Sequence, residues 1–147
     1  MIPPFADGIN LPPGGHECTW DELVDRFCSG YGRQNLCQRL RQLVERAKRC
    51  GALKVLVGGS FPTSKKEPGD LDLSWIVPES IRKDSLSQEC RELLTEPKHS
   101  RERFGCDTLY LPIAGNHEKI QYWAAQLGYD TKTRTERGMA LLDLSCI

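Results

Sequence analysis

Two short apolar runs in the middle of the chain predict two β-strands joined by a loop. The first run, residues 53–57, ends in Gly58, Gly59 and Ser60, and a polar loop that contains proline follows it. In the second stretch, residues 70–77, apolar side chains alternate with polar ones. Strand side chains point to opposite faces of a sheet with a period of two, so the polar residues of this stretch share one face. The sequence therefore predicts strand, turn, loop and strand over residues 53–77.

Other stretches have apolar residues at helical or strand spacing, and these predict helices that flank a sheet. Thr19 and Glu22 form a capping box that begins the first helix. The remaining predicted helices are residues 33–49, 84–94 and 116–127, and the remaining predicted strands are residues 106–111 and 139–144. The arginines of the second helix are expected on a solvated face. The chain is thus predicted to have an α/β (α+β) fold, with a short mixed β-sheet flanked by helices.

Length and composition limit the classes of protein that this chain can represent. Its 147 residues suffice for one domain, and we expect an extended N-terminal arm over residues 1–18 and a single domain over residues 19–147. The formal net charge is zero, so no DNA partner is expected. No apolar run is long enough for a membrane span, and no leader pattern is present, so we expect no membrane partner and a cytoplasmic location.

The seven cysteines are an odd number and include no Cys-x-x-Cys pair. Together with the missing leader pattern, this argues against a disulfide framework or a zinc site. We therefore expect most of them to be small, buried apolar residues.

The candidate chemistry lies at the predicted strand–loop–strand unit. Asp70 and Asp72 share one strand face, close to the turn formed by Gly58, Gly59 and Ser60. Magnesium binds through one or two carboxylates together with the phosphates of a substrate. Glycines let backbone N–H groups approach a phosphate, and a serine hydroxyl adds a donor. This combination is typical of a nucleoside triphosphate site.

The same residues carry a resemblance to a known superfamily. Gly-Gly-Ser-Phe at 58–61 followed by Asp-Leu-Asp at 70–72 resembles the signature of the nucleotidyltransferases related to DNA polymerase beta. The surrounding sequence, the N-terminal segment and the C-terminal RGMALLDL are similar to a small bacterial family of uncharacterised nucleotidyltransferase-like proteins. The resemblance spans nearly the whole chain and implies the minimal nucleotidyltransferase fold for residues 19–147.

The resemblance also implies a reaction: transfer of a nucleoside monophosphate from a nucleoside triphosphate to a hydroxyl of a protein or RNA acceptor. Asp70, Asp72 and Asp107 are the implied catalytic residues and ligands of Mg²⁺ or Mn²⁺, and Asp107 is also the implied proton acceptor. Lys65 and Arg137 are implied to offset charge on the phosphates. A protein partner encoded nearby, as in a toxin–antitoxin or defence operon, is a further implication.

Two alternatives to an enzyme remain open. A catalytically inactive binding module, such as an antitoxin, would present Trp75, Trp123 or Tyr122 on an exposed patch. A nucleotide sensor would keep the turn and the two aspartates but displace Asp107. The basic connector over residues 96–103 could line the approach to a triphosphate, although a solvated loop is the default interpretation.

Overall fold

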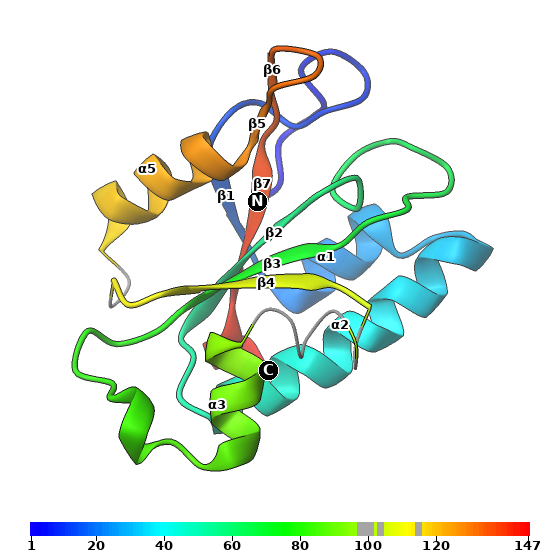
Figure 1. Cartoon of the computed structure of the whole chain (residues 1–147). Coiled ribbons are helices and arrows are strands. Elements are labelled where there is room, and N and C mark those ends of the chain that lie inside the picture. Colours follow the sequence, from blue (N-terminus) through cyan, green and yellow to red (C-terminus); the bar gives the residue numbers. More distant parts are fainter. Residues whose placement is uncertain (97–101, 103–104, 114–115) are drawn as a thin grey trace.

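A five-stranded mixed sheet forms the middle layer of the molecule, with helices on both faces (Figure 1). The computed structural model describes residues 1–96, 102, 105–113 and 116–147, so most of the connector over residues 96–103 lies outside the described residues. In spatial order the strands are β1 (Gly15–Cys18), β7 (Met139–Asp143), β2 (Lys54–Gly58), β3 (Asp72–Ile76) and β4 (Asp107–Leu111). β1 with β7 and β3 with β4 are parallel pairs, whereas β2 is antiparallel to both of its neighbours. The predicted α+β fold is confirmed.

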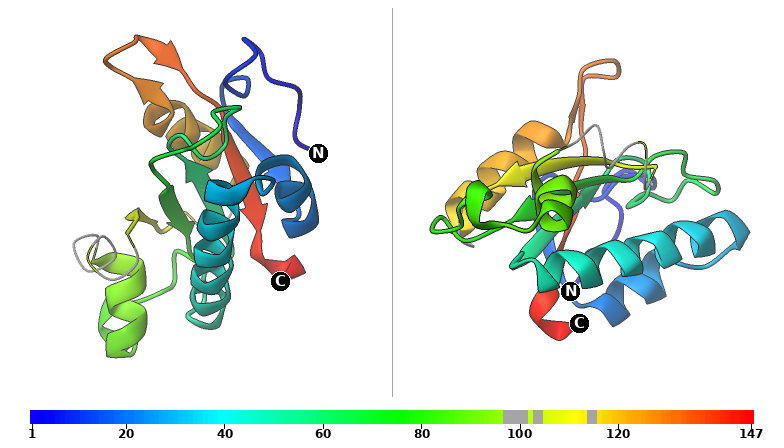
Figure 2. Two further views of the ribbon diagram at one scale, coloured as in Figure 1. Left: turned by 90° about the vertical axis from the view of Figure 1, so that its right-hand side faces the viewer. Right: turned by 60° about the horizontal axis from the view of Figure 1, so that its bottom comes forward.

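Within the described residues, four α-helices flank this sheet, together with two 3₁₀ turns and a small hairpin. The helices are α1 (Trp20–Phe27), α2 (Tyr31–Arg49), α3 (Gln88–Thr95) and α5 (His117–Leu127), the turns are η1 (Lys83–Ser85) and η2 (Leu144–Cys146), and the hairpin strands are β5 (Tyr129–Asp130) and β6 (Thr135–Glu136). The two views in Figure 2 place α1 and α2 on the opposite side of the sheet from α5. Among the helices that the structure describes, none combines the length and apolar composition needed to cross a membrane.

Helix starts follow the capping residues. The Thr19 hydroxyl accepts a hydrogen bond from the Glu22 N–H at 3.3 Å, and the Asn116 side chain accepts one from the Lys119 N–H at 3.1 Å. Each of these bonds satisfies a backbone donor that the first helical turn leaves without a partner. The predicted beginnings of α1 and α5 are therefore confirmed.

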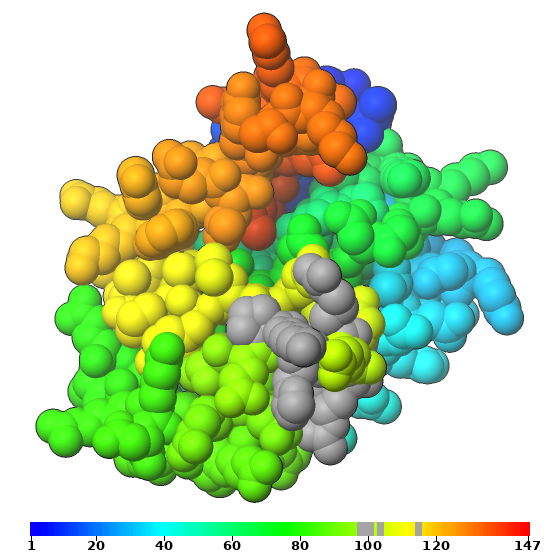
Figure 3. All heavy atoms as spheres, viewed as in Figure 1, coloured from blue at the N-terminus to red at the C-terminus, as the bar shows by residue number. Residues whose placement is uncertain are grey.

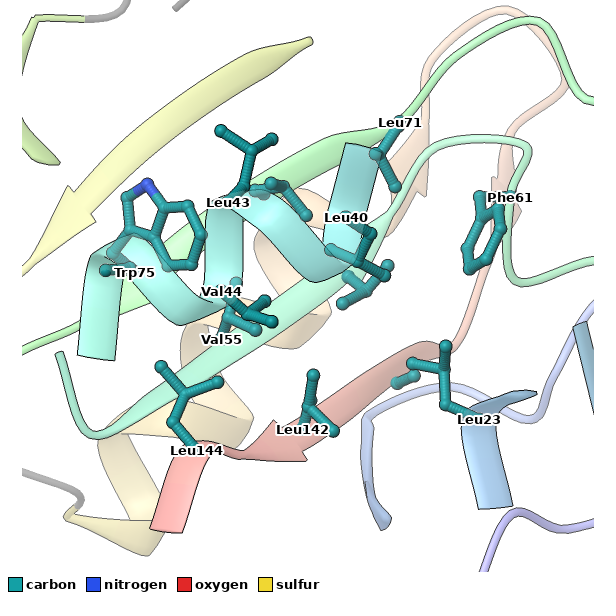
Figure 4. Packing of buried hydrophobic residues seen from close by; sticks show 14 of the residues in the cluster. Leu23, Leu40, Leu43, Val44, Val55, Phe61, Leu71, Trp75, Leu142 and Leu144 are labelled. Atoms are coloured by element: carbon teal, nitrogen blue, oxygen red, sulfur yellow. The ribbon is translucent and has the colours of Figure 1, made fainter. Parts of the chain in front are cut away.

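Apolar residues cover both faces of the sheet, because successive side chains along each strand point to opposite faces. On one face Val55, Trp75 and Leu142 pack in one cluster with residues of α1, α2 and α3, among them Val44 (Figure 4). On the other face the apolar strand residues pack against α5. Asp72 and Ser74 alternate with Leu73 and Trp75 along β3 and share a face with Ile76, which belongs to the α5 layer.

The N-terminal arm is shorter than predicted, because its last four residues, Gly15–Cys18, form the edge strand β1. Close backbone contact holds the arm beside the start of β7. The Gly138 N–H donates to the Leu11 carbonyl at 3.0 Å, and a Cβ added at Gly138 would lie 1.9 Å from the Pro12 oxygen. Glycine is required here because any side chain would push the arm away from the sheet.

Two disulfides correct the expectation for the cysteines. Cys28 is bonded to Cys37, with Cα atoms 5.9 Å apart, and Cys50 to Cys90, with Cα atoms 5.5 Å apart. Cys28 and Cys50 are the residues that follow the last turns of α1 and α2, where the chain reverses and brings distant cysteines together. Sequence spacing does not encode such proximity, so the interpretation as small apolar residues was wrong for these four.

Removing the longer cross-link should destabilise the protein more than removing the shorter one. Cys50→Ser/Cys90→Ser opens a link across 40 residues and should cost about 4 kcal/mol, against about 3 kcal/mol for Cys28→Ser/Cys37→Ser, which spans 9. Urea unfolding measures both. Protein alkylated at cell lysis in denaturant without reductant should show three alkylated cysteines, because the other four are bonded in pairs. Seven alkylated cysteines would contradict the pairing and would fit a reducing, cytoplasmic setting instead.

Candidate functional site

Three strands bring the predicted site residues to one end of the sheet. β3 and β4 run parallel and begin there with Asp72 and Asp107, while the antiparallel β2 ends there with Gly58. Asp72 is the direct pairing partner of both Gly58 and Asp107. Neighbouring strands lie about 4.8 Å apart, so the two aspartates start side by side on the same face of the sheet.

A cavity of about 670 Å³ lies over this end of the sheet. Figure 3 shows it as a hollow between the orange β5–β6 hairpin and the green and yellow strands, with β7 in red at its base. Six of the eight predicted site residues line it, namely Gly58, Gly59, Asp70, Asp72, Asp107 and Arg137. The structure therefore brings together residues that are up to 79 positions apart, from Gly58 to Arg137, while Ser60 and Lys65 lie elsewhere.

Ser60 is buried and fixes Asp70 to the glycine turn. Its backbone N–H donates to Asp70 Oδ1 at 2.9 Å, and its hydroxyl donates to the same oxygen. The N–H groups of Gly69 and Asp70 in turn donate to the Ser60 hydroxyl, at 3.0 and 3.2 Å. These bonds commit the hydroxyl to the loop, so in this structure Ser60 positions Asp70 rather than facing the cavity.

Gly59 cannot be replaced by another residue without disturbing the turn. Its φ of +77° lies in the left-handed region, which other residues rarely adopt. A Cβ at this position would also lie 2.9 Å from Asp70 Oδ2 and 3.0 Å from the Asp70 carbonyl oxygen. The backbone at Gly59 therefore lies too close to Asp70 to leave room for a side chain.

Gly59→Ala should destabilise the protein by about 1–3 kcal/mol, because it combines backbone strain with displacement of Asp70. The matched control is Gly69→Ala in the same loop, where an added Cβ meets nothing within 4 Å. The control should change stability by about 0.5 kcal/mol or less. Thermal or urea unfolding compares the two, and equal costs would contradict the account of the turn.

Arg33 anchors the loop that follows the glycine turn through its buried guanidinium. Only 7% of its surface is exposed, and its guanidinium donates to the carbonyl oxygens of Phe27 (3.2 Å), Phe61 (2.7 Å), Thr63 (2.6 Å) and Lys65 (2.5 Å). Burial lowers the pKa of the guanidinium from its ordinary value. The expectation of a solvated face for the arginines of α2 was wrong for Arg33, since carbonyls of a distant loop replace water around it.

Lys65 does not join the carboxylates. It lines a separate cavity of about 410 Å³ at the start of α2, together with Arg33 and Lys66. The loop carries the Lys65 side chain to that side because its backbone carbonyl is bonded to Arg33. This arrangement does not support the predicted contact between Lys65 and a phosphate at the aspartates.

Arg137 does line the cavity of the aspartates, and it is oriented by a partner. Its Nη2 atom lies 2.6 Å from Oδ2 of Asp130, across the β5–β6 hairpin. A hydrogen bond from the Lys132 N–H and, after it, the Arg137 charge lower the pKa of Asp130. This hairpin was not predicted from the sequence, and neither was the place of Lys132 as a second cation that lines the cavity. Strands of two residues leave too short a pattern to detect.

A family model matches residues 3–143 of the chain, which includes every strand of the five-stranded sheet. The chain belongs to a family of unknown function, DUF6932. No curated protein and no solved structure matches it. The region matched by DUF6932 contains all six residues that line the cavity as predicted.

Within this DUF6932 domain, the carboxylates give the site a negative field. Burial raises the pKa of the Cys106 thiol to about 11, and the charges of Asp107 and Asp72 add to that rise. The part of the chain that the structure describes contains no group of three or more His, Cys, Asp or Glu residues arranged to hold a metal ion. Asp72 and Asp107 are nevertheless hard oxygen donors side by side, and magnesium needs only one or two carboxylates when a substrate supplies phosphate oxygens.

Proposed function

We propose that the protein is a magnesium-dependent nucleotidyltransferase, which transfers a nucleoside monophosphate from a nucleoside triphosphate to a hydroxyl of a protein or RNA acceptor. The observation that carries the proposal is the direct pairing of Asp72 with Asp107, on one face of the sheet and in one cavity with the Gly58–Gly59 turn. The resemblance of the Gly-Gly-Ser and Asp-Leu-Asp motifs to nucleotidyltransferases gives this geometry a specific chemistry.

In the proposed reaction the acceptor hydroxyl oxygen forms a bond to the α-phosphorus of the triphosphate. The bond from that phosphorus to the bridging oxygen breaks, and pyrophosphate leaves with the electron pair. Asp107 accepts the proton of the hydroxyl and passes it to water. When bound, Mg²⁺ or Mn²⁺ would be held by Asp72 and Asp107, with Asp70 beside them, and would offset the charge of the attacking and leaving oxygens.

The rest of the cavity fits the phosphates. Gly58 and Gly59 have no side chain to keep a phosphate away from the backbone. Arg137 and Lys132 supply positive charge on the opposite wall, from the hairpin. Asp130 holds the Arg137 guanidinium in one orientation, which reduces the entropy lost when a phosphate binds.

A second candidate is a binding module that acts on a partner protein encoded nearby, as in a toxin–antitoxin pair. On α5, Tyr122 is 59% exposed, and its ring packs edge-on against Trp123 at a centroid distance of 5.6 Å. These two aromatics form a candidate contact surface. Trp75, which was considered for the same role, is fully buried in the core and cannot contribute.

Nucleotide binding distinguishes the two candidates. Thermal unfolding is measured with ATP, GTP, CTP or UTP, each with and without Mg²⁺. At about 100 times its dissociation constant, a ligand that binds only the folded protein adds roughly 2.7 kcal/mol of stability. Stabilisation that requires Mg²⁺ supports the transferase, whereas no change with any nucleotide at millimolar concentration favours the binding module.

A further inference from the structure

The cavity has a second wall whose chemistry differs from that of the carboxylates. Three large apolar side chains line it while remaining partly open to solvent: Leu109 is 37% exposed, Leu127 39% and Tyr129 46%. Single exposed apolar residues are ordinary on a protein surface, but a group of them in one concavity indicates a binding surface. A site with carboxylates and cations at one end and apolar groups at the other fits a ligand that is itself charged at one end and apolar at the other.

The positions of these three side chains are fixed by the fold. Leu109 lies two residues beyond Asp107 on β4, so both point to the same face of the sheet. Leu127 and Tyr129 flank Gly128, which closes α5 and accepts a hydrogen bond from the Arg137 N–H at 2.8 Å. A Cβ at Gly128 would lie 2.1 Å from the Arg137 carbonyl oxygen, so the hairpin is packed tightly against the end of the helix.

Resting on the proposed function, we infer that Leu109, Leu127 and Tyr129 bind the nucleobase of the triphosphate. The phosphates would then reach Asp72, Asp107 and the glycine turn at the other end of the cavity. Bases stack on aromatic side chains, and loss of such a side chain commonly weakens binding by roughly tenfold or more. Tyr129 is the aromatic member of this wall.

The same wall predicts which nucleotides bind. Stacking tolerates every base, because each has a flat aromatic face, and it favours the larger ring system of purines. The wall therefore favours ATP and GTP over CTP and UTP.

The test compares dissociation constants for the four nucleotides and for inorganic tripolyphosphate, all with Mg²⁺, by calorimetry. Tyr129→Ala should weaken ATP and GTP roughly tenfold and leave tripolyphosphate unchanged, and Tyr129→Phe should retain the binding of all ligands. Unchanged binding of tripolyphosphate also shows that the variant is folded. The control is Tyr122→Ala, an exposed tyrosine on α5 outside the cavity, which should change nothing.

The possible failures are separable. If the unmodified protein binds ATP no more tightly than tripolyphosphate, or if Tyr129→Ala leaves ATP binding unchanged, the base site is overturned while the phosphate and metal site stands. Tighter binding of CTP or UTP than of ATP would overturn the purine preference. If the unmodified protein binds neither ATP nor tripolyphosphate, the proposed function fails, and the base site fails with it.

Discussion

Asp107→Asn and Asp72→Asn should each abolish the Mg²⁺-dependent stabilisation by nucleoside triphosphate, a loss of roughly 2.7 kcal/mol at 100 times the dissociation constant. Asparagine keeps the size of the side chain but removes the charge that a divalent cation requires. The two aspartates pair directly across β3 and β4, so each contributes to the same small region of the cavity. Differential scanning fluorimetry with and without Mg²⁺ and ATP measures the effect.

Asp25→Asn provides the matched control for these variants. Asp25 is an exposed aspartate of α1 and does not line the cavity, so its replacement should leave the nucleotide response intact. The account also predicts that both site variants unfold as cooperatively as the unmodified protein. A full nucleotide response in Asp107→Asn would remove Asp107 from the site and leave a nucleotide sensor as the better description.

Arg33→Met should destabilise the protein by about 3–5 kcal/mol, because each buried carbonyl left without a donor costs about 1–3 kcal/mol. The guanidinium bonds carbonyls from the end of α1 and from the loop that carries the glycine turn. Methionine fills a similar volume and supplies no donor, so the loss isolates the hydrogen bonds. Arg33→Lys should recover only part of the stability, since an ammonium group cannot match the planar fork of the guanidinium.

Urea unfolding of Arg33→Met is compared with Arg49→Met, an exposed arginine on the last turn of the same helix. The control should cost about 0.5 kcal/mol or less. Because Arg33 holds the loop that positions Asp70, its loss should also weaken nucleotide binding in the fraction that remains folded. A cost for Arg33→Met that equals the cost for Arg49→Met would contradict the role assigned to the buried guanidinium.

Local patterns in the sequence predicted much of the fold. The caps at Thr19 and Asn116 and the alternation along β3 depend on residues close together in the chain, and the structure confirms them. The position of Asp107 beside Asp72 was also expected, from the resemblance. These features follow from helical and strand periodicity and from turn chemistry, which short segments carry in full.

Most of the features that the sequence did not predict depend on distant parts of the chain. β1 pairs with β7, a strand more than 120 residues away, and its four residues are too few to show a strand pattern. The burial of Arg33, the position of Lys65 away from the aspartates and the pairing of Cys50 with Cys90 each depend on where a remote segment lies. The β5–β6 hairpin that carries Tyr129 is local, and it was missed because strands of two residues are too short to show a period.

The most direct test of the account is the fate of labelled phosphate. The protein is incubated with Mg²⁺, total RNA or candidate partner proteins, and ATP or GTP labelled at either the α- or the γ-phosphorus, with Asp72→Asn/Asp107→Asn as the control. The account predicts that α-label becomes bound to an acceptor, that γ-label is released as pyrophosphate, and that the double variant does neither. Transfer of γ-label to the acceptor would show phosphoryl rather than nucleotidyl transfer, and equal activity of the double variant would show that the paired aspartates are not the site.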